Sequence, residues 1–328
     1  MQQLLNQLYA REPLSRQVAY QTLRRIAVGE AAEPEIAAVV SAINMRPPYL
    51  TEIQGFRDAM LELALPLAVD RDTIDIVGTG GDGKHTFNIS TLSCVVVAGA
   101  GYPVTKHGSY GVSSKVGSSD VLQALGYAFS NDSDKLRRDL DRAGICFLHA
   151  PLFHPAMKNV VPVRKALRVR TFFNLLGPLI NPVRPRYQVF GTYDRGVSRI
   201  YDYILQAEAD RQYAIVHALD GYDEISLTGG VSVRGRRMQG IWYPQDFQLP
   251  QLTAPALYGG DTPAAGKAIF LGVLSGEASP AQQAVVCANA GLGIHVIHPE
   301  RSLVDCVAEA RASIESGRAH DVLRKLLG

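Results

Sequence analysis

The sequence predicts an α/β protein in which a small N-terminal α-helical domain precedes a larger α/β domain with a mostly parallel central sheet. Three observations support this prediction. Residues 1–70 carry only helical periodicity. From residue 73 onward, short apolar strands alternate with capped helical segments, which is the pattern of parallel βαβ units. With 328 residues, 47% of them hydrophobic, the chain is long enough for two domains.

Three amphipathic helices are expected in the N-terminal segment. Ser15 fits the N-cap of the first, whose apolar residues recur at helical spacing until Gly29. The second covers residues 33–44 and ends before Pro47, and the third covers residues 53–65. This segment carries no chemical motif, so its apolar faces are predicted to form a core or, alternatively, a subunit interface.

The α/β domain is expected to begin with a buried strand at residues 74–77 that leads directly into a glycine turn. A helix from residue 90 to 98 and a strand near residue 104 complete a first βαβ unit. The remaining pattern predicts helices that begin near Ser118 and Ser133, strands at 145–148, 187–192 and 213–217, a helix at 197–209, polar strands within 231–243, a loop to about 264, a helix at 280–290, a strand at 295–298 and a helix at 302–316.

Charge and cysteine content argue against several classes of protein. Lysine and arginine number 33 against 31 acidic residues, so the net charge of +2 gives no global attraction to nucleic acid or to a membrane. The four cysteines lie far apart without a CxxC pair, which is typical of reduced thiols and indicates the cytoplasm. No signal peptide and no membrane-spanning run is recognisable, so neither secretion nor membrane insertion is expected.

A glycine turn follows the first predicted strand. Its glycines allow left-handed backbone conformations, so successive N–H groups can form an anion-binding nest. The turn matches neither common nucleotide-binding glycine motif, and such turns are often only structural. Hydroxyl and amide side chains follow it at the start of a predicted helix, and a lysine ends the next strand, so we predict a phosphate site. The residues concerned are Gly78, Gly80, Gly81, Gly83, Thr86, Asn88, Ser90, Thr91 and Lys106.

Other polar positions allow more than one interpretation. Asp82 could close the glycine turn through its own side chain, or it could hold a ribose hydroxyl or, through water, a metal bound to diphosphate. His107 is interpreted as a structural turn residue rather than as a base. Asp223 and Glu224 at a strand end could form a solvated turn. Together with a diphosphate site, however, they favour Mg²⁺ that bridges carboxylate and phosphate oxygens.

Four motifs, in their order and spacing, resemble the anthranilate phosphoribosyltransferase family. The motifs are GTGGDGKHTFNIST, KHGSYGVSSKVGSSDVLQALG, HPAMKNVVPVRKALRVRTFFNLLGPLINP and DGYDEISLTGG. The first also occurs, in looser form, in the related pyrimidine nucleoside phosphorylases. The four together are specific, and the resemblance covers nearly the whole chain.

The resemblance implies two domains and one reaction. A small helical domain of residues 1–70, with residues 165–180 packing onto it, would be joined by a hinge to an α/β domain of residues 71–164 and 181–328. The family is usually a homodimer through its helical domain. Its enzymes transfer the phosphoribosyl group of 5-phospho-α-D-ribose 1-diphosphate (PRPP) to the amine of anthranilate. They release diphosphate in the presence of Mg²⁺, as the second step of tryptophan biosynthesis from chorismate.

The resemblance also implies which residues bind each ligand. Lys106, Asp223 and Glu224 would act electrostatically, and no acid or base is expected, because the reaction needs mainly positioning and charge neutralisation. Anthranilate would contact Gly78, Ser109 and Arg164, whose guanidinium suits a carboxylate. Mg²⁺ would be held by Ser90, Asp223 and Glu224. PRPP would be held by Gly78, Gly81, Asp82, Thr86, Asn88, Ile89, Ser90, Thr91, Lys106, Gly108, Ser113, Ser114 and Ser118.

One departure from the family pattern concerns the acceptor. The family turn usually reads KHGN, whereas this chain has Ser109 as the fourth residue. A serine hydroxyl reaches less far than an amide, so we expect Ser109 to weaken anthranilate binding or relax acceptor choice by about 1 kcal/mol. Comparing kcat/KM of the native chain with that of Ser109→Asn tests this expectation. Equal or poorer use of anthranilate by the variant would refute it.

Three alternatives from other classes remain open at this point. A phosphoribosyltransferase for a different aromatic acceptor would differ mainly at Ser109. A pyrimidine nucleoside phosphorylase would share the two-domain plan, but Arg164 and the Asp223–Glu224 pair favour the transferase. A non-catalytic relative that binds nucleic acid would be expected to show a strongly basic face, for which the charge balance gives no support.

Overall fold

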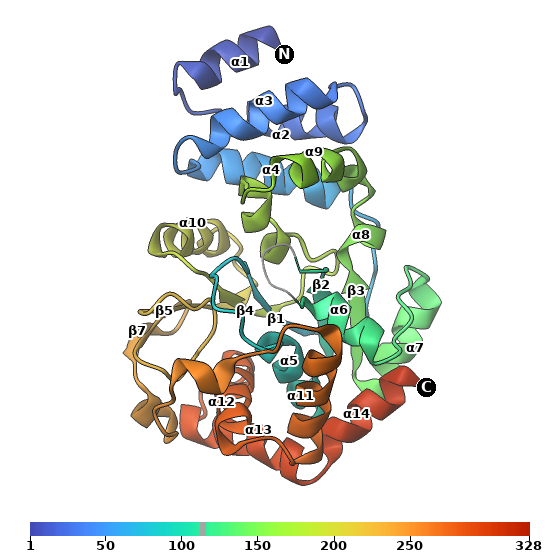
Figure 1. Ribbon diagram of the computed structural model, residues 1–328, viewed down its shortest axis with the longest axis vertical. Helices are drawn as coiled ribbons and strands as arrows, with labels where there is room; N and C mark the ends of the chain where they lie inside the picture. Colours follow the sequence, from blue (N-terminus) through green and yellow to red (C-terminus); the bar gives the residue numbers. More distant parts are fainter. Residues whose placement is uncertain (112–115) are drawn as a thin grey trace. The chain divides into compact units, whose positions relative to one another are not determined.

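The computed structural model describes residues 1–111 and 116–328 (Figure 1). The chain divides into two compact units, which are described separately below. The helical unit consists of Met1–Leu67 and Ala150–Arg184, and the α/β unit consists of Ala68–His149 and Pro185–Gly328. The second segment of the helical unit is therefore longer than residues 165–180, and residues 150–164 lie outside the α/β unit in which we expected them.

The helical unit contains α-helices joined by short loops and 3₁₀ turns. α2 packs against α4, and α1 and α9 pack against α3 (Figure 1). Ser15 caps α2 as predicted, since its hydroxyl accepts a hydrogen bond from the backbone N–H of Val18 at 3.2 Å. The elements are α1 (Gln2–Tyr9), α2 (Arg16–Ala27), α3 (Glu33–Asn44), α4 (Leu50–Glu62), α8 (Ala150–Phe153), η1 (Pro155–Asn159), α9 (Val161–Leu167), η2 (Phe172–Leu175) and η3 (Gly177–Ile180).

Residues 150–184 are tied to the helical unit by hydrogen bonds to the C-terminal ends of α2 and α3. The side-chain amide of Asn159 donates to the carbonyl oxygens of Ile26 and Ala27, at 3.2 and 3.0 Å, where α2 ends. At the end of α3, the side chain of Asn44 donates to the Arg170 carbonyl at 2.7 Å and accepts from the Phe172 N–H at 3.2 Å. These contacts join residues more than a hundred positions apart, so local sequence patterns do not reveal them.

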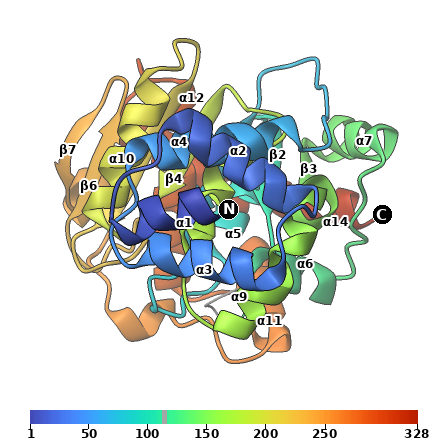
Figure 2. The ribbon, with the colours of Figure 1, turned by 90° about the horizontal axis from the view of Figure 1, so that it is seen from above.

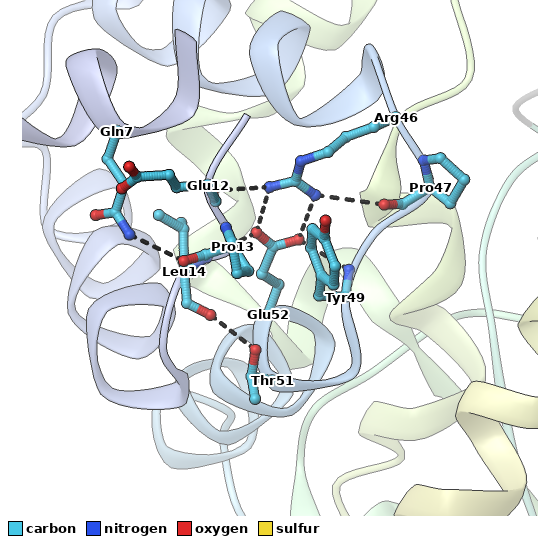
Figure 3. A network of polar contacts seen from close by, with 9 residues as sticks. All are labelled: Gln7, Glu12, Pro13, Leu14, Arg46, Pro47, Tyr49, Thr51 and Glu52. Atoms are coloured by element: carbon cyan, nitrogen blue, oxygen red, sulfur yellow. Dashed lines mark hydrogen bonds and ion pairs between the residues drawn. The ribbon is translucent and has the colours of Figure 1, made fainter. Parts of the chain in front are cut away.

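A buried ion pair organises the loops around α4 (Figure 3). The carboxylate of Glu52 is fully buried and accepts hydrogen bonds from both terminal nitrogens of Arg46, at 2.9 and 2.6 Å. It also accepts from the backbone N–H groups of Leu14 and Tyr49, at 3.0 and 2.9 Å. The Arg46 guanidinium lies over the Tyr49 ring at 4.5 Å. Every oxygen of this buried carboxylate is therefore matched by donors from the chain.

Over the described residues of the α/β unit, seven strands form one sheet in the order β3-β2-β1-β4-β5-β6-β7. Neighbours from β3 to β5 are parallel, and β6 and β7 add an antiparallel edge, so the predicted mostly parallel sheet is confirmed. In Figure 2, β6 and β7 lie at the opposite end of the sheet from β2 and β3. The strands are β1 (Ile74–Gly78), β2 (Val104–Gly108), β3 (Ile145–His149), β4 (Tyr187–Gly191), β5 (Gln212–Ala218), β6 (Val231–Gly235) and β7 (Gln239–Trp242).

The strand order reverses between β1 and β4. From β1 the chain proceeds to β2 and β3 on one side, and from β4 it proceeds to β5 on the other side. In open α/β sheets, ligands bind outside the carboxyl ends of the strands at such a switch point. The carboxyl ends of β1 and β4 are therefore the expected place for a site.

Helices cover the sheet, and the long helix α12 (Pro280–Ile297) packs against α5, β4 and β5. The prediction of a strand at residues 295–298 is wrong, because α12 continues to Ile297. The helix is apolar on all sides and buried over most of its length, and a short apolar run cannot be assigned to helix or strand by periodicity. The other α-helices are α5 (Ile89–Gly99), α6 (Ser118–Ala124), α7 (Ser133–Ala143), α10 (Arg195–Gln206), α11 (Pro263–Ser275), α13 (Leu303–Glu315) and α14 (Arg318–Leu327).

Helix α11 was not among the predicted elements, although its end signals are present in the sequence. The hydroxyl of Thr262 accepts from the Ala265 N–H at 3.2 Å, Pro263 is the first helical residue, and Gly276 ends the helix in a left-handed conformation. The preceding loop contains the short turns η4 (Pro244–Phe247) and η5 (Ala254–Leu257). No helix in the described parts of the chain combines the length and the apolar character that crossing a membrane requires.

Candidate active site

The centre of the candidate site is the loop after β5, which brings Asp223 to the ends of β1 and β4. Gly78 and Gly191 are paired in register at these two strand ends. A Cβ atom on Gly191 would lie 1.6 Å from the backbone oxygen of Asp223, and one on Gly78 would lie 2.3 Å from its Oδ2 atom. Only glycine leaves room at both positions for the loop that carries the carboxylate.

The glycine turn after β1 closes around the same carboxylate. Gly80, Gly81 and Gly83 have left-handed backbone conformations, with φ of 64°, 78° and 73°. The N–H of Gly80 donates to Oδ2 of Asp223 at 2.6 Å. The turn therefore directs a backbone donor at an anion, as predicted for a nest, and in this structure the anion is the carboxylate of the chain itself.

Glu224 occupies the N-terminal end of α5. The backbone N–H of Ser90 is near its carboxylate and acts to lower its pKa, and the hydroxyl of Thr86 donates to its Oε2 atom at 3.4 Å. The unpaired N–H groups of a helix start stabilise a negative charge. Thr86 and Ser90 of the predicted phosphate site are thus brought together with the predicted metal ligands.

The acidic side chains repel one another in a buried environment. Burial, followed by the charge of Asp82, raises the pKa of Asp223 to about 7. Burial and the neighbouring charges of Asp223 and Asp82 also raise the pKa of Glu224, and the Ser90 and Thr86 hydrogen bonds oppose that rise only in part. This arrangement stabilises a cation strongly, because a positive charge relieves both the repulsion and the desolvation.

Asp82 takes the first of the two roles that the sequence left open, closure of the glycine turn. Its Oδ1 atom accepts from the Lys84 N–H at 3.0 Å, which closes the turn as an Asx residue does. Its buried Oδ2 atom has no hydrogen-bond donor among the described residues, and the side chain lies against Asp223. Among those residues, no group of three or more histidine, cysteine, aspartate or glutamate side chains could hold a metal ion by itself. A cation would therefore need further ligands from water or substrate.

The rest of the first turn links the site to the core. Asn88 precedes α5, and its side-chain amide donates to the Val116 carbonyl at 3.3 Å, so it connects the two polar turns. Ile89 is fully buried in the hydrophobic core. Thr91 is buried as well, and its hydroxyl has no hydrogen-bond partner within the described residues. In this chain the side chain of Ile89 anchors the helix, so any contact with a ligand must come from its backbone.

Lys106 lies deeper than the sequence indicated. It is 1% exposed, and its ammonium group donates to the carbonyl oxygens of Ile76 and His107, at 2.9 and 3.3 Å. The ammonium nitrogen also lies 3.7 Å from Oδ1 of the buried Asp75. His107 is buried too, and its N–H donates to Oδ2 of Asp75 at 3.4 Å, which agrees with a structural role. Lys106 thus supplies a positive charge beneath the strand ends.

The second polar turn follows β2. The hydroxyl of Ser118 and the N–H of Ser119 both donate to the carbonyl oxygen of Ser109, each at 3.1 Å. Gly108 is required here, since a Cβ atom on it would lie 2.5 Å from the Ser118 hydroxyl. Ser113 and Ser114, which we predicted to bind phosphate, lie outside the described residues.

Arg164 belongs to the helical unit and is described with that unit. It lies in α9 and is partly buried, and burial lowers the pKa of its guanidinium. Its Nη2 atom donates to Oδ1 of Asn174 at 3.3 Å, and the guanidinium carbon lies 5.7 Å from the centre of the Phe173 ring. Within the described residues, this is the one hydrogen bond that the guanidinium makes, which leaves further N–H donors for a carboxylate.

Two features of the site were not recognised from the sequence. Asn289 of α12 fixes the acidic loop, because its Oδ1 atom accepts from the Ile225 N–H at 3.0 Å and its Nδ2 atom donates to the Ile225 carbonyl at 2.9 Å. Gly259 packs on Thr86, and its N–H donates to the His85 carbonyl at 2.9 Å. An amide within the apolar run of residues 284–294 was a usable signal for Asn289, whereas nothing local marks Gly259.

The chain matches known protein families over most of its length. Two family descriptions apply: "Glycosyl transferase family, helical bundle domain" over residues 2–64 and "Glycosyl transferase family, a/b domain" over residues 70–320. The anthranilate phosphoribosyltransferase of Cytophaga hutchinsonii is 49% identical over 326 residues, which cover 99% of each chain. That of Bacteroides fragilis is 46% identical over 328 residues, which cover 100% of this chain and 99% of the relative.

Solved structures show the same architecture. The crystal structure of anthranilate phosphoribosyltransferase from Thermus thermophilus matches with a TM-score of 0.91 and 34% identity, and the match covers 99% of this chain and 98% of that chain. The enzyme from Saccharomyces cerevisiae, solved in complex with PRPP and Mg, matches with a TM-score of 0.89 at 24% identity, over 99% of this chain and 96% of that chain. At that identity, the yeast structure supports the fold alone.

Proposed function

The chain belongs to the anthranilate phosphoribosyltransferase family, and we propose that it transfers the phosphoribosyl group of PRPP to the amine of anthranilate. The products are N-(5-phosphoribosyl)anthranilate and diphosphate, and the step is the second of tryptophan biosynthesis from chorismate. The observation that carries this proposal is the acidic pair of the buried Asp223 and the partly buried Glu224, which meets the glycine turn at the switch point of the sheet. Release of diphosphate requires a site of this kind, where a cation and backbone amides take up negative charge.

The cofactor in this proposal is Mg²⁺, held by Asp223, Glu224 and Ser90. The donor set fits, because Mg²⁺ prefers oxygen ligands and is usually held by one or two carboxylates together with substrate phosphates and water. The raised pKa values of both carboxyl groups and the unpartnered Oδ2 atom of Asp82, among the described residues, mark a place where positive charge is stabilised. When bound, Mg²⁺ neutralises charge on the diphosphate leaving group.

The residues proposed for PRPP that the structure describes belong to the α/β unit, as these carboxylates do. Binding of diphosphate and cation would free the Gly80 N–H and the Ser90 N–H from the carboxylates that they now contact. Lys106 adds positive charge beneath the strand ends without being consumed by the reaction. The full proposed set is Gly78, Gly81, Asp82, Thr86, Asn88, Ile89, Ser90, Thr91, Lys106, Gly108, Ser113, Ser114 and Ser118.

Anthranilate is proposed to contact Gly78, Ser109 and Arg164, and its carboxylate would pair with the guanidinium fork. The amine attacks C1 of the ribose on the face opposite the departing diphosphate, so the C–N bond forms as the C–O bond breaks. The reaction needs no nucleophile from the protein, because the amine of anthranilate attacks directly. Mg²⁺ held by the carboxylates, together with backbone amides, would take up the charge that develops on the diphosphate.

The assay that tests this proposal follows the loss of anthranilate fluorescence in the presence of PRPP and Mg²⁺. The native chain should turn over anthranilate, and Arg164→Ala should raise KM for anthranilate by about tenfold or more while KM for PRPP changes little. Lys165→Ala is the matched control, because Lys165 is an exposed cation on the same helix. Absence of turnover by the native chain, or phosphorolysis of uridine in its place, would refute the assignment.

We further propose that the enzyme works in the cytoplasm as a homodimer formed through its helical unit. All four cysteines are buried free thiols, which suits a reducing compartment. Light scattering of the purified native chain tests the dimer, since a mass of one chain at micromolar concentration would contradict it.

A further inference from the structure

A histidine outside the proposed ligand set lies beside the second polar turn. His149 is the last residue of β3, is 5% exposed, and pairs in register with Gly108 of β2. Its ring stacks on Phe129, with centroids 4.3 Å apart and an angle of 16°, and meets the Tyr110 ring edge-on at 5.0 Å. Its Nδ1 atom lies 2.9 Å from the hydroxyl oxygen of Ser119.

These contacts connect His149 to the backbone of Ser109. The Ser119 side chain forms the hydrogen bond with the imidazole. The backbone N–H of Ser119 donates to the Ser109 carbonyl at 3.1 Å. Tyr110, which follows Ser109 in the chain, is held from the other side by the ring contact. The imidazole therefore contacts Tyr110 directly and fixes the Ser109 carbonyl through one intermediate residue.

The chemistry of the contact suits a neutral imidazole. Burial lowers the pKa of His149, so the ring is uncharged at neutral pH. A neutral imidazole has one donor and one acceptor nitrogen, and a serine hydroxyl can rotate to match either. The bond is buried on both sides, so removing one partner leaves the other unsatisfied.

We propose that His149 is a positioning residue for the acceptor, because it fixes through Ser119 the backbone of Ser109 and, through its ring, Tyr110. This inference rests on the proposed function, in which Ser109 contacts anthranilate. PRPP is proposed to bind mainly through the glycine turn and the acidic loop and only in part through Gly108 and Ser118 of the second turn. Loss of the His149–Ser119 hydrogen bond should therefore affect anthranilate more than PRPP.

The test compares variants on either side of the hydrogen bond. His149→Phe keeps an aromatic ring between Phe129 and Tyr110 but removes the nitrogen, and Ser119→Ala removes the hydroxyl. Each should raise KM for anthranilate about fivefold while kcat and KM for PRPP stay within about twofold. The double variant should be no worse than either single one, because both delete the same bond. His149→Asn, whose amide can occupy the place of Nδ1, should recover most of the affinity.

The control is Tyr127→Phe, which removes another buried hydrogen bond from the same aromatic cluster. The Tyr127 hydroxyl bonds Asp139 at 3.2 Å, and its ring meets Phe129 edge-on. This variant should lower the melting temperature without changing KM for anthranilate. If His149→Phe and Ser119→Ala lower only the melting temperature, as Tyr127→Phe should, or raise KM for anthranilate and for PRPP equally, His149 has only a structural role. Either result would refute the inference. If His149→Phe does not fold, Ser119→Ala decides alone. Native chain that turns over no anthranilate would refute the proposed function as well.

Discussion

Buried carboxylates occur in both units, and their surroundings differ. In the helical unit, Glu52 accepts four hydrogen bonds, two from Arg46 and two from backbone N–H groups (Figure 3). In the α/β unit, Asp223 and Glu224 lie beside a third acid, Asp82, and receive few donors, and the pKa values of both are raised. The negative charge of Glu52 is balanced by donors and a cation of the chain, whereas the charges of Asp223 and Glu224 are not.

The difference separates a structural from a functional use of the same chemical group. A compensated buried ion pair fixes loops, and breaking it leaves a charge without a partner. An undercompensated acidic pair costs stability in the free protein and is retained where a ligand supplies the missing charge. The two regions should therefore respond in opposite ways to removal of charge, in stability and in activity.

The largest expected effect is on activity, at Asp223. Asp223→Asn should lower kcat/KM by about a thousandfold, because Asp223 is proposed to hold the Mg²⁺ that neutralises charge on the leaving diphosphate. The free energy of unfolding without ligands should stay equal or rise, because a repulsive charge disappears. Steady-state kinetics and urea denaturation measure the two effects. Asp220→Asn is the control, since Asp220 is an exposed acid of the same loop that should change neither value. A large loss of stability in Asp223→Asn would show that Asp223, like Glu52, stabilises the fold, and would contradict the proposed difference between the two carboxylates.

The next effect is on stability, at Arg46. Arg46→Ala should lower the free energy of unfolding by about 3 kcal/mol, because Glu52 then remains buried without its cation. Urea denaturation followed by circular dichroism measures the loss. Arg24→Ala is the control, because Arg24 is exposed and 3.9 Å from Glu62, and its loss should cost less than about 0.5 kcal/mol. Equal losses for the two arginines would show that burial of the Glu52 pair has no special weight.

The smallest effect is a dependence of stability on pH without Mg²⁺. The ordinary pKa of an aspartate is 3.8, and in the folded chain that of Asp223 is about 7. Between these values the folded state binds more protons than the unfolded state, so the free energy of unfolding falls as pH rises from about 4 to 7. Melting temperatures across this range should therefore decline in the native chain and decline less in Asp223→Asn. Added Mg²⁺ with diphosphate should weaken the decline. A melting temperature that rises between pH 4 and 7 equally in the native chain and in Asp223→Asn would contradict the raised pKa of Asp223.

Local patterns in the sequence predicted much of the α/β unit. The strand before Gly78, the left-handed glycines after it, and the acidic pair after β5 are local features, because each depends on residues next to one another in the chain. Alternation of strands and helices was sufficient to predict a mostly parallel sheet. The order of strands, which places Gly78 beside Gly191, was not predicted, because registers between distant strands leave no local trace.

Other features could not be predicted because they depend on distant partners. Residues 150–164 were assigned to the wrong side of the boundary in our expectation, since Asn159 acts on α2 from far along the chain. The burial of Lys106 against Ile76 and Asp75 likewise follows from strand packing. The end of α12 was misassigned because an apolar run without periodicity fits either element.

The amide of Asn289 has a consequence for how the acidic loop moves. It offers Ile225 one acceptor and one donor, as the backbone of a neighbouring strand would, and its Nδ2 atom also donates to Val285 within α12 at 2.8 Å. One side chain thus mimics a peptide unit and joins the loop to α12 through two hydrogen bonds. Because α12 is buried in the core, exchange of the Ile225 amide hydrogen should require opening of the whole unit, so the residues next to Glu224 behave as interior rather than as loop.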